Sequence, residues 1–269
     1  LNAYRSASLS ASEAFGLNDR GIIAPGKKAD IVILENLEEC KAKSVICSGK
    51  VVDEKLFSTV KRVDPIGLNS VKSKTLKKSD FISKDKTQKT SIIGIIEGKI
   101  ITEHIHDEIP IVNGDKSPDT LKDLVRVSVI ERHGKNNNIA NGFVRGFGLK
   151  KGAVASTVAH DHHNIVSIGI DYEDMAIACN RLKEIKGGFV VASQGKITAE
   201  LSLPIAGLMS LESFEIVRDK LTDLRRSAKD LGIILEEPFL QLAFLALPVI
   251  PSLKITDHGL VDVEKFKII

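Results

Sequence analysis

A series of short β-branched runs that begins near residue 90 constrains the fold of this chain more than any other feature. Most of the runs are separated by Gly or Asn turns, and they cover residues 91–96, 99–105, 125–131, 142–146, 153–159 and 164–170. Two further runs, 188–193 and 196–203, flank Gln194-Gly195. Short β-branched runs bounded by turn residues are typical of strands, and a two-residue spacer predicts a hairpin. We therefore expect a sheet of several strands.

Helices are expected between and after these strands. Asp171 can cap an amphipathic helix that Gly187 ends, and a second amphipathic helix is predicted to start near Ser213 and to stop at Gly232. Residues 238–247 are apolar on nearly every side, so a helix there must be buried. Strands combined with these helices predict an α+β domain.

The first 60 residues follow a different pattern. Ser10 and Glu13 have the spacing of a capping box, and Gly16 is placed to end the short helix that would follow. Residues 22–34 place Pro25-Gly26, which suits the centre of a type II turn, between two β-prone runs, and this predicts a hairpin. Two shorter strands are expected at 44–47 and 50–52. The sequence thus predicts a small β unit that ends near residue 60.

Positive charge is concentrated in one stretch of the chain. Residues 61–91 hold nine Lys or Arg and three acidic residues, a local charge of +6, which leaves the remainder at −3. Aromatic residues make up 4% of the chain and Trp is absent, so no stacking platform for bases is present. We predict a solvated, basic polar linker over residues 61–90 rather than a tail that binds polyanions, and we expect no nucleic-acid partner.

Cysteine usage and hydropathy bear on the compartment. The chain has an odd number of cysteines (Cys40, Cys47 and Cys179) with no short pairing, which indicates neither a disulfide framework nor a Cys-x-x-Cys site. No apolar run approaches the ~20 residues that span a bilayer, and residues 1–12 are too polar for a signal peptide. We expect a cytoplasmic protein without a membrane partner. Because the sequence opens with Leu1 inside a helical pattern, we also expect a part of a longer or split protein.

Two resemblances cover the chain. Residues 10–34 (SASEAFGLNDRGIIAPGKKADIVIL) resemble the end of the amidohydrolase superfamily, where the last barrel helix runs into the returning strands of a small β-sandwich. The later sequence resembles the carboxyl-terminal domain of adenine deaminases in seven ordered phrases: IIGIIEGKII (92–101), ERH (131–133), GFVRGFGLKK (142–151), VAHDHHN (158–164), EDM (173–175), LPIAGLMS (203–210) and FLALPVIP (244–251). The implied parts are the barrel and sandwich end (1–60), the linker (61–90) and an α+β adenine deaminase carboxyl-terminal domain (91–269).

The resemblance implies hydrolysis of adenine to hypoxanthine and ammonia, with attack of a metal-bound hydroxide at C6 of the purine. The family suggests manganese or iron, held by residues on barrel strands that would precede Leu1. It therefore implies no catalytic residue and no metal ligand in this chain. The implied partners are the missing amidohydrolase barrel portion, in the same polypeptide or a separate chain, and adenine; a homo-oligomer is left open.

The best site candidate is a polar loop between two expected strands. Its substrate-proximal candidates, which match the family phrase, are His160, Asp161, His163 and Asn164, with His133 as a weaker companion. His162 stands where a small residue is expected. Imidazole and carboxylate groups can hold a metal or hydrogen-bond a purine edge, and spacing does not choose between these roles. We expect the loop to face the barrel mouth and to help enclose the active site; the alternatives are a polar turn with solvated imidazoles and, at Glu131-Arg132, an exposed ion pair.

Two other patterns are interpreted as structural. His104 and His106 form a His-x-His pair, but without further ligands we expect two exposed histidines near the end of a strand. Residues 142–148 (GFVRGFG) lack a following Gly-Lys-Ser/Thr and are strand-like, so their glycines indicate bulges or close backbone approach instead of a phosphate loop.

Three functions follow from these observations. In the first, the chain contributes scaffold and active-site cover to an adenine deaminase and is inactive alone. In the second, it is a catalytically inert remnant of such an enzyme. In the third, the His160 loop makes it a stand-alone module that binds a metal or a purine.

Overall fold

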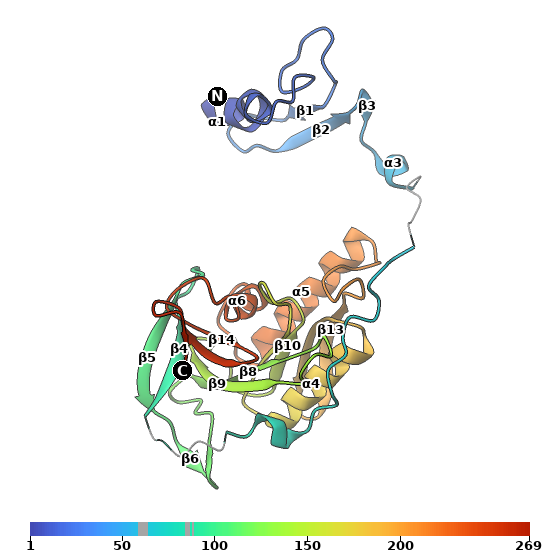
Figure 1. The fold of residues 1–269 in the computed structure, drawn as a ribbon. Helices are drawn as coiled ribbons and strands as arrows, with labels where there is room; N and C mark the ends of the chain where they lie inside the picture. Colours follow the sequence, from blue (N-terminus) through green and yellow to red (C-terminus); the bar gives the residue numbers. More distant parts are fainter. Residues whose placement is uncertain (59–63, 84–86, 88) are drawn as a thin grey trace. The chain divides into compact units, whose positions relative to one another are not determined.

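The structure is a computed structural model that describes residues 1–269 except 59–63, 84–86 and 88. Contacts divide the chain into two units, Leu1–Asp64 and Pro65–Ile269, and each unit has its own sheet (Figure 1). Among the described helices, none is both long and apolar enough to cross a bilayer.

The amino-terminal unit begins with a helical segment made of α1 (Asn2–Arg5), a π-helical turn (Ser6–Ser10) and α2 (Ala11–Ala14). Ser10 has helical backbone angles (φ −65°, ψ −37°) and its side chain makes no capping hydrogen bond, so the predicted capping box is wrong. The physical reason is that the helix already starts at Asn2, which moves the free backbone N–H groups upstream of Ser10. The predicted helix end at Gly16 is confirmed by its left-handed φ of +66°.

The sheet of this unit has the order β1-β2-β3, with β1 at Ile31–Leu34, β2 at Ala42–Cys47 and β3 at Lys50–Val51, and α3 (Glu54–Ser58) follows. The two shorter predicted strands are therefore confirmed. The predicted 22–34 hairpin is wrong, because β1 pairs with β2 and residues 22–30 contain no strand. The predicted turn at Pro25-Gly26 is confirmed, because the Lys27 N–H donates to the Ala24 carbonyl (3.1 Å) and Gly26 has a φ of +79°. The Lys28 N–H donates to the Asp19 carbonyl (2.6 Å), so the chain before this turn folds locally and does not pair with β1.

The carboxyl-terminal unit is built on a mixed sheet of eight strands in the order β13-β12-β10-β11-β8-β9-β4-β5 (Figure 1). Neighbouring strands are antiparallel except β4 and β9, which are parallel. The bounds are β4 Lys89–Ile95, β5 Thr102–Glu108, β8 Leu124–Ile130, β9 Ile139–Arg145, β10 Ala153–Ser156, β11 Ile165–Gly169, β12 Gly188–Ser193 and β13 Lys196–Ser202. Each strand overlaps a predicted run, and the hairpin around Gln194-Gly195 is confirmed.

Helices cover both faces of this sheet. α4 (Tyr172–Glu184) packs on one face, where Met175 and Ala178 contact a core that includes Ala153 and Ala155. α5 (Phe214–Asp230) and α6 (Pro238–Phe244) belong to the core of the other face, which contains Val154. Side chains of neighbouring strand residues point to opposite faces, which explains why these adjacent residues serve two cores. The predicted helices and the α+β fold class are confirmed.

Asp171 caps α4 as the sequence predicts. Its carboxylate accepts the backbone N–H groups of Glu173 and Asp174 at 2.7 and 3.2 Å. These bonds satisfy two of the free donors at the helix start.

The stretch predicted as a solvated linker contains buried side chains. Val71, Leu76 and Phe81 are at most 8% exposed and belong to the core under α4, and a 3₁₀ turn covers Lys78–Phe81. The Asn180 side chain of α4 bonds to both the N–H and the carbonyl of Leu76 (2.9 Å each). The linker interpretation is wrong for this part, because spaced apolar residues anchor it while most of its lysines stay in water. Residues 61–63, 84–86 and 88 of the predicted linker lie outside the described residues.

Short strands complete the carboxyl-terminal unit: β6 (Ile111–Val112) with β7 (Asp115–Lys116), and β14 (Leu253–Thr256) with β15 (Gly259–Asp262) and β16 (Lys267–Ile268). The β14–β15 hairpin was not predicted from the sequence. It is important for the site, because its turn approaches the loop between β10 and β11.

Candidate functional site

The predicted loop joins β10 to β11 and turns at His160, Asp161 and His162. Asp161 is exposed, whereas His160, His162 and His163 are half-buried. The His160 ring meets the Phe244 ring of α6 edge-on, with 5.2 Å between centroids. This geometry differs from the alternative interpretation of a turn whose imidazoles face water.

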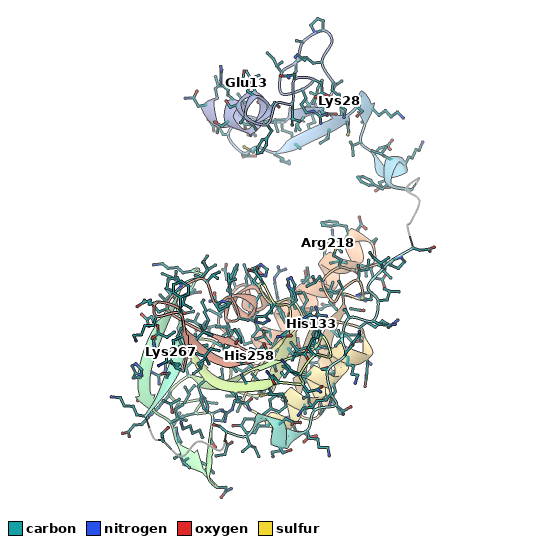
Figure 2. All side chains as sticks on the ribbon, in the orientation of Figure 1. Glu13, Lys28, His133, Arg218, His258 and Lys267 are labelled. Carbon is teal, nitrogen blue, oxygen red and sulfur yellow. The ribbon has the colours of Figure 1, made fainter. Side chains whose placement is uncertain are left out.

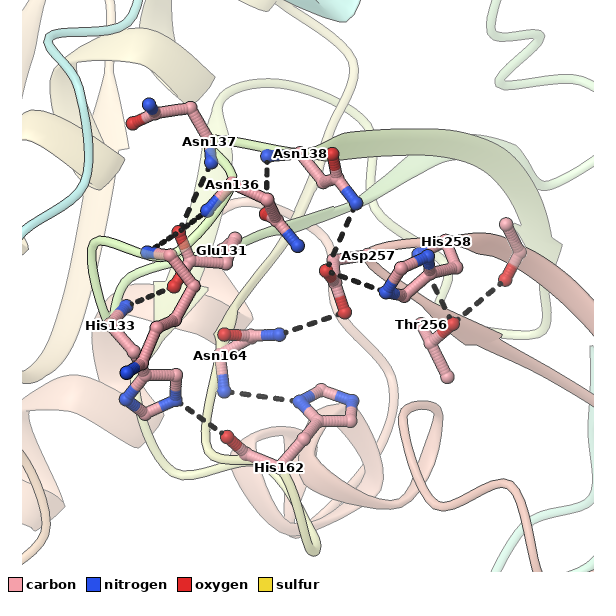
Figure 3. Close-up of polar contacts among 12 residues, drawn as sticks. Glu131, His133, Asn136, Asn137, Asn138, His162, Asn164, Thr256, Asp257 and His258 are labelled. Atoms are coloured by element: carbon pink, nitrogen blue, oxygen red, sulfur yellow. Dashed lines mark hydrogen bonds and ion pairs between the residues drawn. The ribbon is translucent and has the colours of Figure 1, made fainter.

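Asn164 anchors the loop and is 3% exposed. Its side-chain oxygen accepts the Arg132 backbone N–H (3.3 Å), and its side-chain nitrogen donates to Asp257 Oδ1 (3.1 Å). Its own backbone N–H donates to His162 Nδ1 at 3.1 Å (Figure 3). Since Nδ1 acts as the acceptor, a neutral His162 carries its proton on Nε2.

His133, the weaker candidate, lies beside the same loop. Its Nε2 atom donates to the carbonyl oxygen of His162 at 2.8 Å (Figure 3). The ring is otherwise exposed. Figure 2 labels His133 on the carboxyl-terminal unit, together with His258.

Glu131 does not form the exposed ion pair that was the alternative for residues 131 and 132. It is 3% exposed, and its carboxylate accepts the backbone N–H groups of His133, Lys135, Asn136 and Asn137 (Figure 3). Burial raises the pKa of Glu131, but the hydrogen bonds from Asn137 and its neighbours outweigh burial and hold the pKa below its ordinary value. The carboxylate therefore organises the turn after β8.

Arg132 is equally buried, at 1% exposed. Its guanidinium donates to backbone carbonyls of Ser70, His163 and Ala206 and not to Glu131. The exposed ion pair is therefore wrong. The backbone accepts hydrogen bonds from the buried cation and donates them to the buried anion, so the two side chains serve different loops.

Asp257 and His258 complete the polar cluster, and sequence reasoning missed them. They lie in the β14–β15 turn, and the Asp257 side chain is 11% exposed. Asp257 Oδ2 receives the Asn138 side-chain N–H at 3.5 Å and lies 3.6 Å from His258 Nε2. A polar Asp-His-Gly turn was a possible signal for this hairpin, but nothing local connects it to a residue 93 positions earlier.

Three imidazole nitrogens of the loop are buried without a hydrogen-bond partner among the described residues: His160 Nδ1, His162 Nε2 and His163 Nδ1. Burial lowers the pKa of His162 and of His163, so both imidazoles are neutral near pH 7. Neutral imidazoles offer one donor and one acceptor each, which suits a polar heteroaromatic ligand. Within the described ranges, no three or more His, Cys, Asp or Glu side chains are grouped so as to hold a metal ion, and the residues present do not fit one.

The His-x-His pair lies apart from this cluster, on β5. His104 Nε2 is 2.9 Å from Ser91 Oγ, and the His104 side chain is 17% exposed. The prediction of two exposed histidines is thus confirmed for His106 and wrong for His104. The two imidazole rings pack against each other, with 4.4 Å between their centroids. The glycines of residues 142–148 were predicted to permit bulges or close backbone approach. Gly146 supports this prediction, because a Cβ at this position would lie only 2.7 Å from Ile95 Cβ.

Comparison with known proteins agrees with these features. A family model described as the adenine deaminase C-terminal domain matches residues 99–267, and one described as the amidohydrolase family matches residues 1–52. Proteins named adenine deaminase from Cereibacter sphaeroides and Sinorhizobium fredii are each 58% identical over 269 residues, which is 100% of this chain and 48% of each relative. One from Brucella anthropi is 58% identical over 263 residues, 98% of this chain and 47% of the relative. The chain spans about half the length of the curated relatives it matches.

Proposed function

Since this chain belongs to the adenine deaminase C-terminal domain family, we propose that it works as part of an adenine deaminase, which converts adenine and water to hypoxanthine and ammonia. The observation that carries the proposal is the 58% identity over the whole chain to proteins named adenine deaminase. Because those relatives are about twice as long, the proposed enzyme also contains an amidohydrolase barrel portion, in the same polypeptide or in a partner chain.

The proposal assigns the metal to the barrel portion. Manganese or iron would supply a hydroxide for attack at C6 of adenine. The described residues of this chain do not fit such an ion, so no catalytic step is assigned to them. This chain contributes scaffold and a cover for the active site.

The cover is the loop of residues 160–164. Its backbone is held by Arg132 and Asn164, and its buried imidazoles leave nitrogen atoms free for hydrogen bonds. A purine carries ring nitrogens and an exocyclic amine, which can pair with neutral imidazoles that present both donors and acceptors. A preorganised polar loop of this kind orients a substrate and excludes water from the reacting centre.

The proposed compartment is the cytoplasm. Cys40, Cys47 and Cys179 are all free thiols, which accords with a reducing compartment. Whether the complete enzyme forms a homo-oligomer stays open, and light scattering on the joined protein would measure its oligomeric state.

The test is to join or co-express this chain with the barrel portion of the Cereibacter sphaeroides relative, in manganese-containing medium, and to follow ammonia release from adenine. We expect turnover with both parts present and none from either part alone. His163→Ala is expected to reduce turnover by about tenfold or more, with His106→Ala on β5 as the matched control. Equal ammonia release with and without this chain would falsify the proposal.

The unpartnered imidazole nitrogens also favour one second function, a stand-alone module that binds purines. Calorimetric titration of the isolated chain with adenine tests it, and absence of heat removes it. An inert remnant is the remaining alternative, and it predicts no turnover in the joined protein although both parts are folded.

A further inference from the structure

Arg132 is a fully buried cation without a carboxylate partner among the residues that the structure describes. It follows β8, is 1% exposed, and burial lowers its pKa to about 10. A buried charge of this kind is costly unless it is well hydrogen-bonded. Because no carboxylate among the described residues neutralises Arg132, its hydrogen bonds must stabilise the buried cation next to the candidate loop.

The guanidinium joins three segments that are far apart in the sequence. Nη1 donates to the Ser70 carbonyl and hydroxyl (3.0 and 3.1 Å), and Nη2 donates to the Ala206 carbonyl (2.9 Å). Nε donates to the carbonyl of His163 in the loop. Arg132 thus bonds the candidate loop to the segment before Val71 and to the segment after β13.

The neighbouring backbone is shaped to admit this side chain. Gly207 has a φ of +73°, and a Cβ at this position would lie 3.0 Å from Arg132 Nη1. An alanine there would press on the guanidinium and strain the backbone. The positive φ and the close approach of the guanidinium both favour glycine at position 207.

The loop residue that Arg132 contacts has an unusual conformation. His163 has a left-handed φ of +50°, which is uncommon for a residue other than glycine and has to be held by its surroundings. Its Nδ1 is buried without a partner among the described residues. A held backbone together with a free, buried ring nitrogen indicates a group kept in place for a ligand.

We propose that Arg132 is a positioning residue, which fixes the backbone at His163 and thereby orients the loop imidazoles toward a bound purine. This role rests on the function proposed above. Arg132 acts through the loop and does not touch the substrate. Burial is the main cause that lowers the pKa of His163; the charge of Arg132 and the nearby His160 act in the same direction, whereas Asp161 and the Ala159 backbone act in the opposite direction. His163 Nδ1 is thereby kept free to accept a hydrogen bond from an N–H group of the purine.

The first experiment uses the isolated chain and needs no activity. Hydrogen exchange is measured at the amides of residues 159–164 in Arg132→Met, in Arg132→Lys and in a matched control, Arg126→Met. Arg126 lies on β8, the strand that Arg132 follows; it is 0% exposed and bonds to Tyr172, away from the loop. We expect exchange in the loop to accelerate about tenfold in Arg132→Met and not in the control.

The charge is tested by NMR titration of the His163 imidazole. We expect its pKa to rise in Arg132→Met and to remain low in Arg132→Lys, which keeps the cation. If Arg132→Met fails to fold, Arg132→Lys still decides the positioning role, because a lysine cannot reproduce the forked contacts and the loop should exchange faster. Unchanged loop exchange in Arg132→Lys would then overturn the proposal.

The second experiment uses the joined protein with its barrel portion. We expect KM for adenine to rise about tenfold in Arg132→Met, with partial rescue by Arg132→Lys and an unchanged KM in Arg126→Met. If ammonia release requires this chain but KM is the same in Arg132→Met and Arg126→Met, the positioning role is wrong and the proposed function survives. If ammonia release never requires this chain, the proposed function is wrong, and the role of Arg132 toward a purine falls with it.

Discussion

The Asn164 side-chain N–H donates to Asp257 Oδ1 at 3.1 Å and joins residues that are 93 positions apart. Through this bond the start of β11 is held against the turn of the β14–β15 hairpin (Figure 3). Asp257 also receives the side-chain N–H of Asn138, so one carboxylate connects three segments. A bond to a charged, mostly buried acceptor contributes more than an ordinary surface contact.

The Asn164–Asp257 bond can be measured by a double-mutant cycle. Asn164→Ala and Asp257→Ala are each expected to lower the free energy of unfolding of the isolated chain by about 1–3 kcal/mol, because each leaves a buried polar partner unpaired. The coupling energy between them is expected near 1 kcal/mol. Additive effects in urea denaturation would show that the bond contributes nothing.

The buried histidines predict a pH dependence of stability. Burial lowers the pKa of His162 and His163 below the ordinary 6.5, so the unfolded chain binds protons more readily than the folded chain. Their stabilising contribution is present above pH 6.5 and is lost as the pH falls below that value. We expect the free energy of unfolding to decrease from about pH 7 to about pH 5.

The control for this pH dependence is the double variant His162→Gln/His163→Gln, which cannot be protonated at these sites. His104 also has a lowered pKa, owing to burial and to His106, and continues to contribute in this variant. The pH dependence should therefore be reduced and not abolished. An unchanged slope between about pH 7 and pH 5 would contradict the assignment.

The three thiols are expected to react at different rates. Cys40 and Cys47 are exposed, whereas Cys179 is buried and burial raises its pKa to about 12. Because the thiolate is the reactive form, Cys179 should be inert in the folded chain. A disulfide reagent should modify Cys40 and Cys47 rapidly under native conditions and Cys179 only after unfolding. Rapid loss of all three thiols without denaturant would be inconsistent with this core.

Phe81 tests whether the basic stretch packs on the domain. Phe81→Ala removes a side chain that is 0% exposed, and we expect a loss of about 3–5 kcal/mol in the free energy of unfolding. The adjacent Ile82 is 39% exposed, so Ile82→Ala is a matched control with a loss of about 1 kcal/mol or less. Equal effects of the two changes would restore the interpretation of a solvated linker.

Much of the carboxyl-terminal unit was predictable because its signals are local. The cap at Asp171 depends on donors two and three residues away, and the Gln194-Gly195 turn joins strands that are adjacent in the chain. The loop candidates were found from a short ordered phrase, and the structure brings His133 to the same loop. In the amino-terminal unit, Ser10 shows the limit of such signals, since the same spacing occurs inside a helix that starts earlier.

The sequence by itself determined the strands, the main helices, the α+β class and the family, because each depends on neighbouring residues or on phrases in a constant order. Only the tertiary structure decided which residues surround the loop. The burial of Arg132, the pairing of Asn164 with Asp257 and the anchoring of Phe81 join segments that are distant in the chain. Such contacts follow from strand order and packing, and no local pattern of side chains encodes them.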